Sequence, residues 1–253
     1  MMERSRLNLP KSAGLKILVA GDFMLDEYIW GQVERISPEA PVQVVEVVRE
    51  SRVLGGAGNV VNNLCGLGAQ VIVLGLVGAD PAAAILRQEL ARLGVNHAGL
   101  FTDPQRPTTQ KTRILGGRQQ MLRLDRERRA AAPTWFATQA AAFFQESLPD
   151  LAAIILSDYG KGVLTPELLK LLLAGGRAQG IPVVVDPKGR DYQRYRGATV
   201  ITPNRKEAEA AVGYPLTGPA ELIQAGRELN QMCDTAAILI TLGPEGMILI
   251  PRD

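Results

Sequence analysis

The sequence has 253 residues, of which 46% are hydrophobic and 21% are charged, and its formal net charge is +2. This length accommodates one large α/β domain or two small ones with a substantial core, and the composition excludes an intrinsically disordered chain. The near balance of charge gives no reason to expect nucleic acid or an anionic membrane surface as a partner.

The start of the chain carries basic residues in positions 1–14, but Asp22 and Asp26 interrupt the apolar run that follows before it could serve as a signal peptide. No stretch approaches the length of about 18 apolar residues that a membrane span needs. Two cysteines, Cys65 and Cys233, lie far apart and lack metal-site spacing. We therefore expect a cytoplasmic protein without a membrane span.

Short apolar runs alternate with helical patterns along the chain. Buried strands are predicted at residues 15–20, 71–77, 152–156, 182–185, 199–201 and 236–241. Helices are predicted at residues 58–67, 81–93, 133–147, 166–179, 204–212 and 219–232, several of which begin with proline. Hydrophobic strands separated by helices indicate a doubly wound α/β fold, with a mainly parallel sheet covered on both faces.

Two segments, at about residues 26–49 and 108–125, break this alternation because each reads as a pair of strands with no helix between them. They are predicted to form a small β-sheet lid outside the main fold. One face of such a sheet needs a partner, which is a substrate or a second subunit. We therefore expect a homodimer formed through the lid.

The first polar candidate is Asp26, which lies just past the first predicted strand. Ligands bind at the carboxyl edge of open α/β sheets, and a carboxylate at that edge can accept hydrogen bonds from two hydroxyl groups of a ligand. An aspartate that only shapes a turn or caps a helix is the alternative.

A glycine-rich run, from Gly55 and Gly56 to Asn59, leads directly into a predicted helix. Glycines let backbone amides approach a polar ligand closely, and the helix N-terminus adds a favourable field. The dinucleotide-binding spacing Gly-x-Gly-x-x-Gly fails at Val61. The alternatives are an ordinary loop with a helix C-cap at Gly68, and a capping role for Asn59.

Four cations, Lys111, Arg113, Arg118 and Arg123, lie in the second lid segment. Alternate residues of a strand share a face, so Lys111 and Arg113 point the same way, as a phosphate-bearing substrate requires. The later arginines also fit a solvated charged face, because acidic residues stand among them. Aromatic residues are not interleaved with this run, which argues against nucleic-acid binding.

Asn204 and Glu207 begin a predicted helix. Asparagine followed three residues later by glutamate is an N-cap with a capping-box partner, and these two residues by themselves favour that interpretation.

Thr241, Gly243 and Gly246 follow the last predicted strand. A threonine hydroxyl and glycine amides at such an edge can hold phosphates, and a plain hairpin turn is the alternative. The only histidine, His97, lies away from every motif, which excludes serine or cysteine triads that need histidine.

These motifs resemble the ribokinase-like, or PfkB, family of carbohydrate kinases. The first signature of that family is a Gly-Gly pair followed by Asn and a helix ending in Leu-Gly, and it is matched from Gly55 to Gly68. The likeness to the heptose-7-phosphate kinase branch is carried by residues 21–26, 37–42, 118–125, 157–162, 186–189 and 202–207. It runs from about Gly14 to Pro251.

The resemblance implies a kinase that uses ATP and Mg²⁺ to phosphorylate the C1 hydroxyl of heptose 7-phosphate, on the route to ADP-heptose and lipopolysaccharide. It implies that the substrate contacts are Asp26, Gly55, Gly56, Asn59, Lys111, Arg113, Arg123 and Lys161. It implies that the ATP contacts are Asp186, Lys188, Asn204, Arg205, Lys206, Glu207, Thr241, Gly243 and Gly246, with Glu207 near the metal through water.

The family places its catalytic base in a second signature, Asp-x-x-Gly-Ala-Gly-Asp, whose glycines open a helix that forms an anion hole. Only Pro251, Arg252 and Asp253 follow Ile250 here. We therefore expect residues 1–253 to be one incomplete kinase domain with its general base beyond Asp253 and little turnover of its own. The alternatives are a non-catalytic sugar-phosphate binding protein and a kinase of the same fold acting on ribose, fructose phosphate or a nucleoside.

Overall fold

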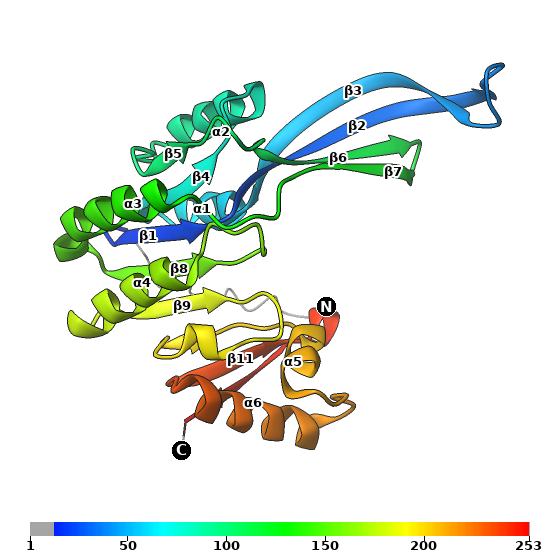
Figure 1. Ribbon diagram of the computed structural model, residues 1–253. Helices are drawn as coiled ribbons and strands as arrows, with labels where there is room; N and C mark the ends of the chain where they lie inside the picture. The colour runs from blue at the N-terminus through cyan, green and yellow to red at the C-terminus, as the bar shows by residue number, and fades with distance from the viewer. Residues whose placement is uncertain (1–12, 253) are drawn as a thin grey trace, which may run out of the picture.

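The main sheet dominates the structure, a computed structural model that describes residues 13–252 (Figure 1). Its eight strands have the order β12-β11-β10-β9-β8-β1-β4-β5 and are parallel except for β12, which pairs antiparallel with β11. They are β1 (Lys16–Gly21), β4 (Gln70–Val77), β5 (Leu100–Thr102), β8 (Ala153–Ser157), β9 (Val183–Asp186), β10 (Val200–Ile201), β11 (Ala237–Thr241) and β12 (Met247–Pro251). Asp253 and most of the N-terminal segment considered as a signal peptide lie outside the described residues.

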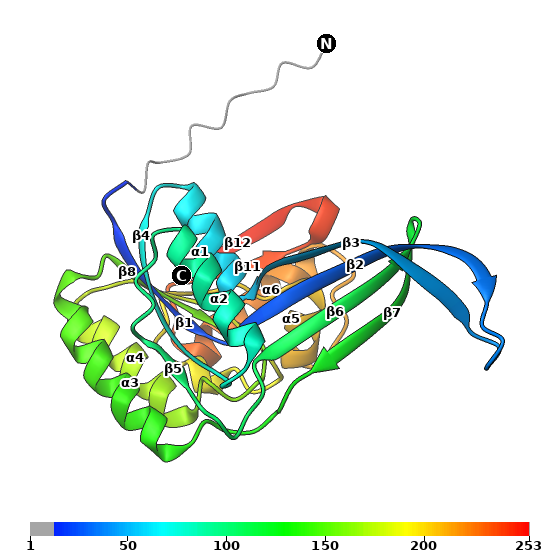
Figure 2. The ribbon, with the colours of Figure 1, turned by 90° about the horizontal axis from the view of Figure 1, so that it is seen from above.

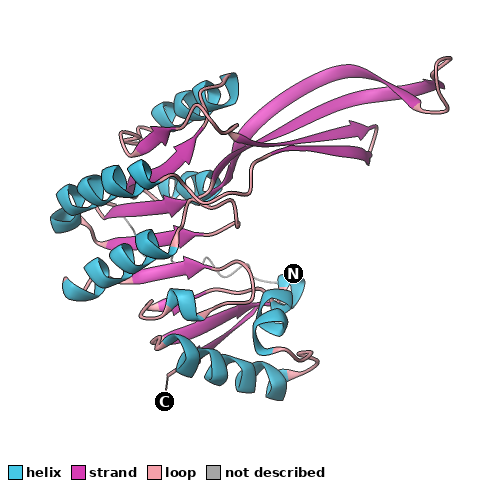
Figure 3. Cartoon of the chain, viewed as in Figure 1, coloured by secondary structure: helices cyan, strands magenta, loops and turns pink. Residues whose placement is uncertain are grey.

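Helices cover both faces of this sheet, so the predicted doubly wound fold is confirmed (Figure 3). They are α1 (Ala57–Gly66), α2 (Pro81–Arg92), α3 (Thr134–Ser147), α4 (Pro166–Ala178), α5 (Arg205–Val212) and α6 (Pro219–Cys233). Neighbouring residues of a strand point to opposite faces. Val19 of β1 accordingly packs in the cluster of α1 and α2, whereas Leu18 packs in the cluster that contains residues of α3 to α6.

The predicted strands and helices of the main fold agree with the observed ones to within one residue at each end. The short strand β5 and the 3₁₀ helices η1 (Leu148–Asp150), η2 (Gln193–Tyr195) and η3 (Gly243–Glu245) were not predicted, because three residues carry no measurable periodicity. Strand β12 was considered only as the second arm of a hairpin turn.

The lid is a separate four-stranded sheet with the order β3-β2-β6-β7. Its strands are β2 (Phe23–Ile36), β3 (Gln43–Gly56), β6 (Thr109–Gly116) and β7 (Gln119–Arg126). Figure 2 shows it reaching away from the main sheet, with the β2–β3 hairpin farthest out. The first lid segment is longer than the predicted residues 26–49, since β3 continues to Gly56 and passes directly into α1.

The two faces of the lid differ in character. Asp26, Tyr28 and Trp30 share one face, where the two rings stack at 5.5 Å and the Arg49 guanidinium lies 3.8 Å from the centre of the Trp30 ring. The opposite face begins with Glu27, which accepts hydrogen bonds from Arg52, Gln110 and Thr112. Farther out this face is apolar, and Val47, Leu122 and Leu124 are 53%, 51% and 48% exposed.

The last residue of β1 must be glycine for β1 and β8 to approach as they do. Gly21 pairs with Ser157, and a Cβ atom at position 21 would collide with the Ser157 carbonyl oxygen.

We expect Gly21→Ala to lower the free energy of unfolding by about 3 kcal/mol, measured by urea denaturation. Gly66→Ala is the control. Nothing lies within 4 Å of the added Cβ there, and alanine favours a helix, so a gain of up to about 1 kcal/mol is expected. Effects of the same sign would contradict this account.

Candidate functional site

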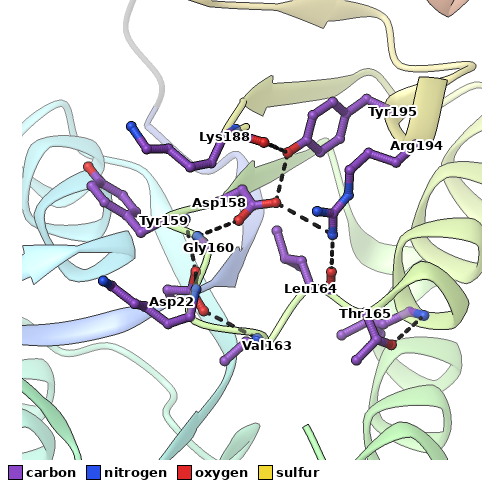
Figure 4. Close-up of polar contacts among 12 residues, drawn as sticks. Asp22, Asp158, Tyr159, Gly160, Val163, Leu164, Thr165, Lys188, Arg194 and Tyr195 are labelled. Carbon is purple, nitrogen blue, oxygen red and sulfur yellow. Dashed lines mark hydrogen bonds and ion pairs between the residues drawn. The ribbon is translucent and has the colours of Figure 1, made fainter. Parts of the chain in front are cut away.

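Asp22 fastens the loop after β8 to the end of β1. Its carboxylate is 1% exposed and accepts hydrogen bonds from the backbone N–H groups of Tyr159 at 2.8 Å, Lys161 at 3.0 Å and Val163 at 3.3 Å (Figure 4). Burial raises the pKa of Asp22 above its ordinary value, although these three bonds oppose the shift. The loop of residues 158–163 is therefore held at the carboxyl edge of the sheet.

Asp158 ties the same loop to the turn after β9. One carboxylate oxygen accepts the Gly160 N–H at 2.8 Å, and the other accepts the Tyr195 hydroxyl at 2.7 Å. The Tyr195 oxygen in turn accepts the Lys188 N–H at 3.1 Å, and the Arg194 guanidinium lies 3.7 Å from Asp158. Figure 4 shows these groups meeting between the two strand ends.

Asp26 lies where the lid joins the main sheet, and its carboxylate is already paired. The Arg113 guanidinium is 2.6 Å from Asp26 Oδ1, and the two side chains are 23% and 20% exposed. Hydrogen bonding to Asp26 raises the pKa of Arg113. Arg113 thus orients Asp26 at the mouth of the site.

The glycine pair is required by close packing beside this carboxylate. A Cβ atom at Gly55 would collide with Asp26 Oδ2, and one at Gly56, where φ is +55°, would lie 2.5 Å from the Asp22 carbonyl oxygen. Both predicted glycines therefore lie against Asp26 and Asp22 at this edge of the sheet. Asn59 is exposed in the first turn of α1 and makes no side-chain cap, so the capping alternative for Asn59 is wrong.

The predicted substrate cations have different partners. Arg123 forms a bidentate pair with Asp125 at 2.9 and 3.0 Å, and Lys161 is buried with its ammonium 2.5 Å from Glu127. Lys111 forms no ion pair with any residue in the described range 13–252. Lys111 therefore lies on the Asp26 face, opposite Asp26 in the pairing of β2 with β6, with its ammonium free of a carboxylate partner among the described residues.

A cavity of about 400 Å³ opens at the same sheet edge, where α5 begins. It is lined by Lys188, Gly189, Arg190, Asn204, Lys206, Glu207 and Ala210. Three cations here face two groups that accept hydrogen bonds, which suits a phosphate chain with a metal ion. Sequence reasoning did not select Arg190, although its position two residues after Lys188 in the same turn was a usable signal.

The start of α5 is capped from within. Asn204 Oδ1 accepts the Glu207 N–H at 3.0 Å, and Glu207 Oε2 accepts the Asn204 N–H at 3.1 Å. Glu207 Oε1 lies 2.9 Å from the Lys188 ammonium. The capping-box alternative is thus realised, and the same two residues line the cavity.

The last motif lies beside this helix start. Thr241 donates its backbone N–H to the Pro203 carbonyl at 2.9 Å, and Arg205 pairs with Glu245 at 2.7 Å. Gly243 and Gly246 have φ values of +62° and +96° in the turn between β11 and β12. The hairpin turn that was weighed as an alternative is therefore present, at the edge where the phosphate contacts are predicted.

Tyr159 lies between the two ends of the site. Burial is the main cause that raises the pKa of its hydroxyl, and the negative charges of Asp186, Asp26, Glu207 and Asp22 raise this pKa further. Its backbone N–H donates to Asp22, which holds Tyr159 at this edge of the sheet. The sequence motif of residues 157–162 contained Tyr159, but nothing in one sequence distinguished it from its neighbours.

Comparison with known proteins gives a consistent family assignment. Residues 15–253 match the model of the pfkB family carbohydrate kinases. The "Bifunctional protein HldE" of Geobacter metallireducens is 50% identical over 239 residues, which cover 94% of this chain and 49% of that protein. That of Citrifermentans bemidjiense is 48% identical over 99% of this chain and 52% of its own length. The chain spans about half the length of these curated relatives.

Solved structures share the fold at much lower identity. Arabidopsis thaliana ribokinase complexed with ribose and ATP is similar with a TM-score of 0.70 at 15% identity, covering 95% of this chain and 75% of that one. Phosphofructokinase-2 from Escherichia coli in complex with substrates and products gives a TM-score of 0.72 at 20% identity, covering 94% and 76%. At these identities the likeness establishes the fold alone.

Asp186 generates a pH-dependent prediction. Burial and the neighbouring Glu207 raise its pKa from 3.8 to about 6, so the folded state binds a proton more tightly than the unfolded state. Stability therefore falls as the pH rises from about 4 to about 6. We expect Asp186→Asn to be more stable than the parent by about 1–2 kcal/mol at pH 7.5, after allowance for solvent screening.

This gain should disappear near pH 4, and urea denaturation at the two pH values measures it. Asp191→Asn, which changes an exposed carboxylate nearby, is the matched control and should have little effect at either pH. A loss of stability for Asp186→Asn at pH 7.5 would contradict the assignment.

Proposed function

Because the chain belongs to the pfkB family of carbohydrate kinases, we propose that it forms the sugar- and ATP-binding part of a heptose 7-phosphate kinase. The reaction is transfer of the γ-phosphate of ATP to the C1 hydroxyl, which supplies ADP-heptose for lipopolysaccharide. One observation carries the proposal: contacts run without a break from Asp26 and the Gly55–Gly56 pair, through the loop of residues 158–163, to the cavity at α5. We place the reaction in the cytoplasm, in keeping with two free cysteines.

The sugar lies at the lid end of this edge. Asp26 accepts sugar hydroxyls, and the amides around Gly55 and Gly56 approach the ligand from the other side. The substrate phosphate projects along the polar lid face toward Lys111, with Arg113 released from Asp26 as a second contact. Phosphoryl transfer depends chiefly on such positioning and on charge stabilisation.

ATP lies at the α5 end, with its phosphates against Lys188, Arg190 and Lys206. Residues 13–252 contain no cluster of three or more His, Cys, Asp or Glu side chains suited to a metal ion. Glu207 would face Mg²⁺ through water, and oxygen atoms of the ATP phosphates would supply the kind of ligand that this ion prefers. The residues present fit such a cation, since the half-buried Asp186 lies close enough to Glu207 for that carboxylate to raise the pKa of Asp186. When bound, the metal neutralises charge on the phosphates.

A binding experiment tests the proposal. In isothermal titration the chain should bind heptose 7-phosphate more tightly than ribose or fructose 6-phosphate. Asp26→Asn should raise the dissociation constant for heptose 7-phosphate by about tenfold or more, because a charged hydrogen-bond acceptor is lost. Asp150→Asn, an exposed carboxylate paired with Lys16 away from the site, is the control and should bind normally.

The alternatives predict other outcomes in the same titration. Sugar binding without ATP binding would favour a non-catalytic sugar-phosphate binding protein, and preference for another sugar would reassign the substrate. We place the general base in the second family signature, outside this chain. Release of ADP by this chain at the rate of one extended through that signature would contradict that placement.

We also propose that two copies associate through the apolar face of the lid. Val47, Leu122 and Leu124 are about half exposed there, and a second copy presents the same surface in return. The double substitution Leu122→Glu and Leu124→Glu should weaken the dimer by about a hundredfold, measured by sedimentation equilibrium. Met247→Glu, at an apolar residue of β12 that is 66% exposed, is the control. A dimer unaffected by the lid substitutions would refute this interface.

A further inference from the structure

A second charged groove lies between α4 and η2, apart from the nucleotide cavity. It encloses about 360 Å³, and its lining includes four cations, Lys170, Arg177, Arg194 and Arg196, but no acidic residue. None of these four residues lines the cavity at the start of α5.

The secondary structure brings the four cations together. Lys170 and Arg177 are seven residues apart on α4, which places them on one face two turns apart. Leu173 and Ala174 lie between them and contribute to the apolar floor. Arg194 belongs to η2 and Arg196 follows it, so the second wall faces the first.

The positive charge of this groove is only partly neutralised, because two of its four cations, Arg194 beside Asp158 and Arg177 beside Asp234, have a carboxylate within 4.0 Å. No carboxylate oxygen of the described residues lies within 4.0 Å of the charged groups of Lys170 or Arg196. Arg177 is 3.6 Å from Asp234, but its side chain is 72% exposed, so water screens that pair. The adjoining cavity at Asp234 differs, because Arg252 pairs with that carboxylate at 2.5 Å.

We propose that this groove binds a small phosphate-bearing anion. Guanidinium groups grip phosphate oxygens through parallel hydrogen bonds, and three of the four cations are arginines. The volume falls within the usual range for small-ligand sites. An anion also relieves the mutual repulsion of four like charges that line one groove.

The groove is connected to the sugar–nucleotide edge through Arg194. This side chain donates to the Leu164 carbonyl and lies 3.7 Å from Asp158, which also receives the hydroxyl of the adjacent Tyr195. Asp158 anchors the loop that presents Tyr159. An anion that draws Arg194 toward the groove therefore weakens one of the contacts that hold this loop.

Titration with inorganic phosphate at constant ionic strength tests the proposal, with backbone amide chemical shifts as the readout. Shifts should cluster at residues 170–177 and 193–197. The double substitution Lys170→Ala and Arg196→Ala should raise the dissociation constant for phosphate by about tenfold or more. Both side chains are exposed, so the double variant should fold. If the double variant does not fold, Lys170→Glu alone should give a similar loss of phosphate affinity.

The control is Arg190→Ala with Lys206→Ala, which removes cations from the nucleotide cavity only. It should leave the groove affinity unchanged within about twofold and abolish any shifts at residues 188–190 and 204–210, which belong to the nucleotide cavity. Phosphate shifts confined to residues 188–190 and 204–210, or a groove affinity that Lys170→Ala and Arg196→Ala leave unchanged, would overturn the proposal. ATP titration of the same variants separates this result from the proposed kinase function.

Discussion

The buried carboxylate of Asp22 is the constraint on which the functional edge depends. It occupies the point where β1 ends and the lid begins, and it satisfies three backbone N–H groups of the loop after β8. A buried carboxylate is costly without such bonds, and loop amides without an acceptor are costly too, so each stabilises the other. The lid, the β8 loop and the glycine pair are all positioned relative to this one group.

The lid combines two surfaces in a single sheet. Strand alternation directs Asp26, Tyr28 and Trp30 to a polar, aromatic face and directs Glu27 to the other, where the apolar residues lie farther out. Both faces are thus specified by one pattern of period two, and a one-residue shift of register would exchange them. The sheet bulges beyond Trp30, where β3 changes its register against β2.

Much of the fold could be predicted from the sequence because its strands are continuous apolar runs and its helices begin at prolines or polar caps. The glycine pair and Asn204 were identifiable for the same reason, since each stands at a strand-to-helix transition. Pairings across the chain could not be predicted. That Arg113 engages Asp26, that Lys161 is buried against Glu127, and that Arg194 faces Asp158 all depend on distances between remote segments. Local pattern contains no information on such distances.

Glu207 has two tasks that cannot be separated. One of its oxygens completes the cap of α5, and the other lies against Lys188 at the cavity. A ligand that attracts the Glu207 carboxylate weakens its hydrogen bond to the Asn204 N–H. A ligand that attracts Lys188 instead removes the competing ion pair and strengthens that hydrogen bond. The amide of Asn204 consequently reports on occupancy, because its rate of exchange with deuterated solvent follows whichever of the two arrangements prevails.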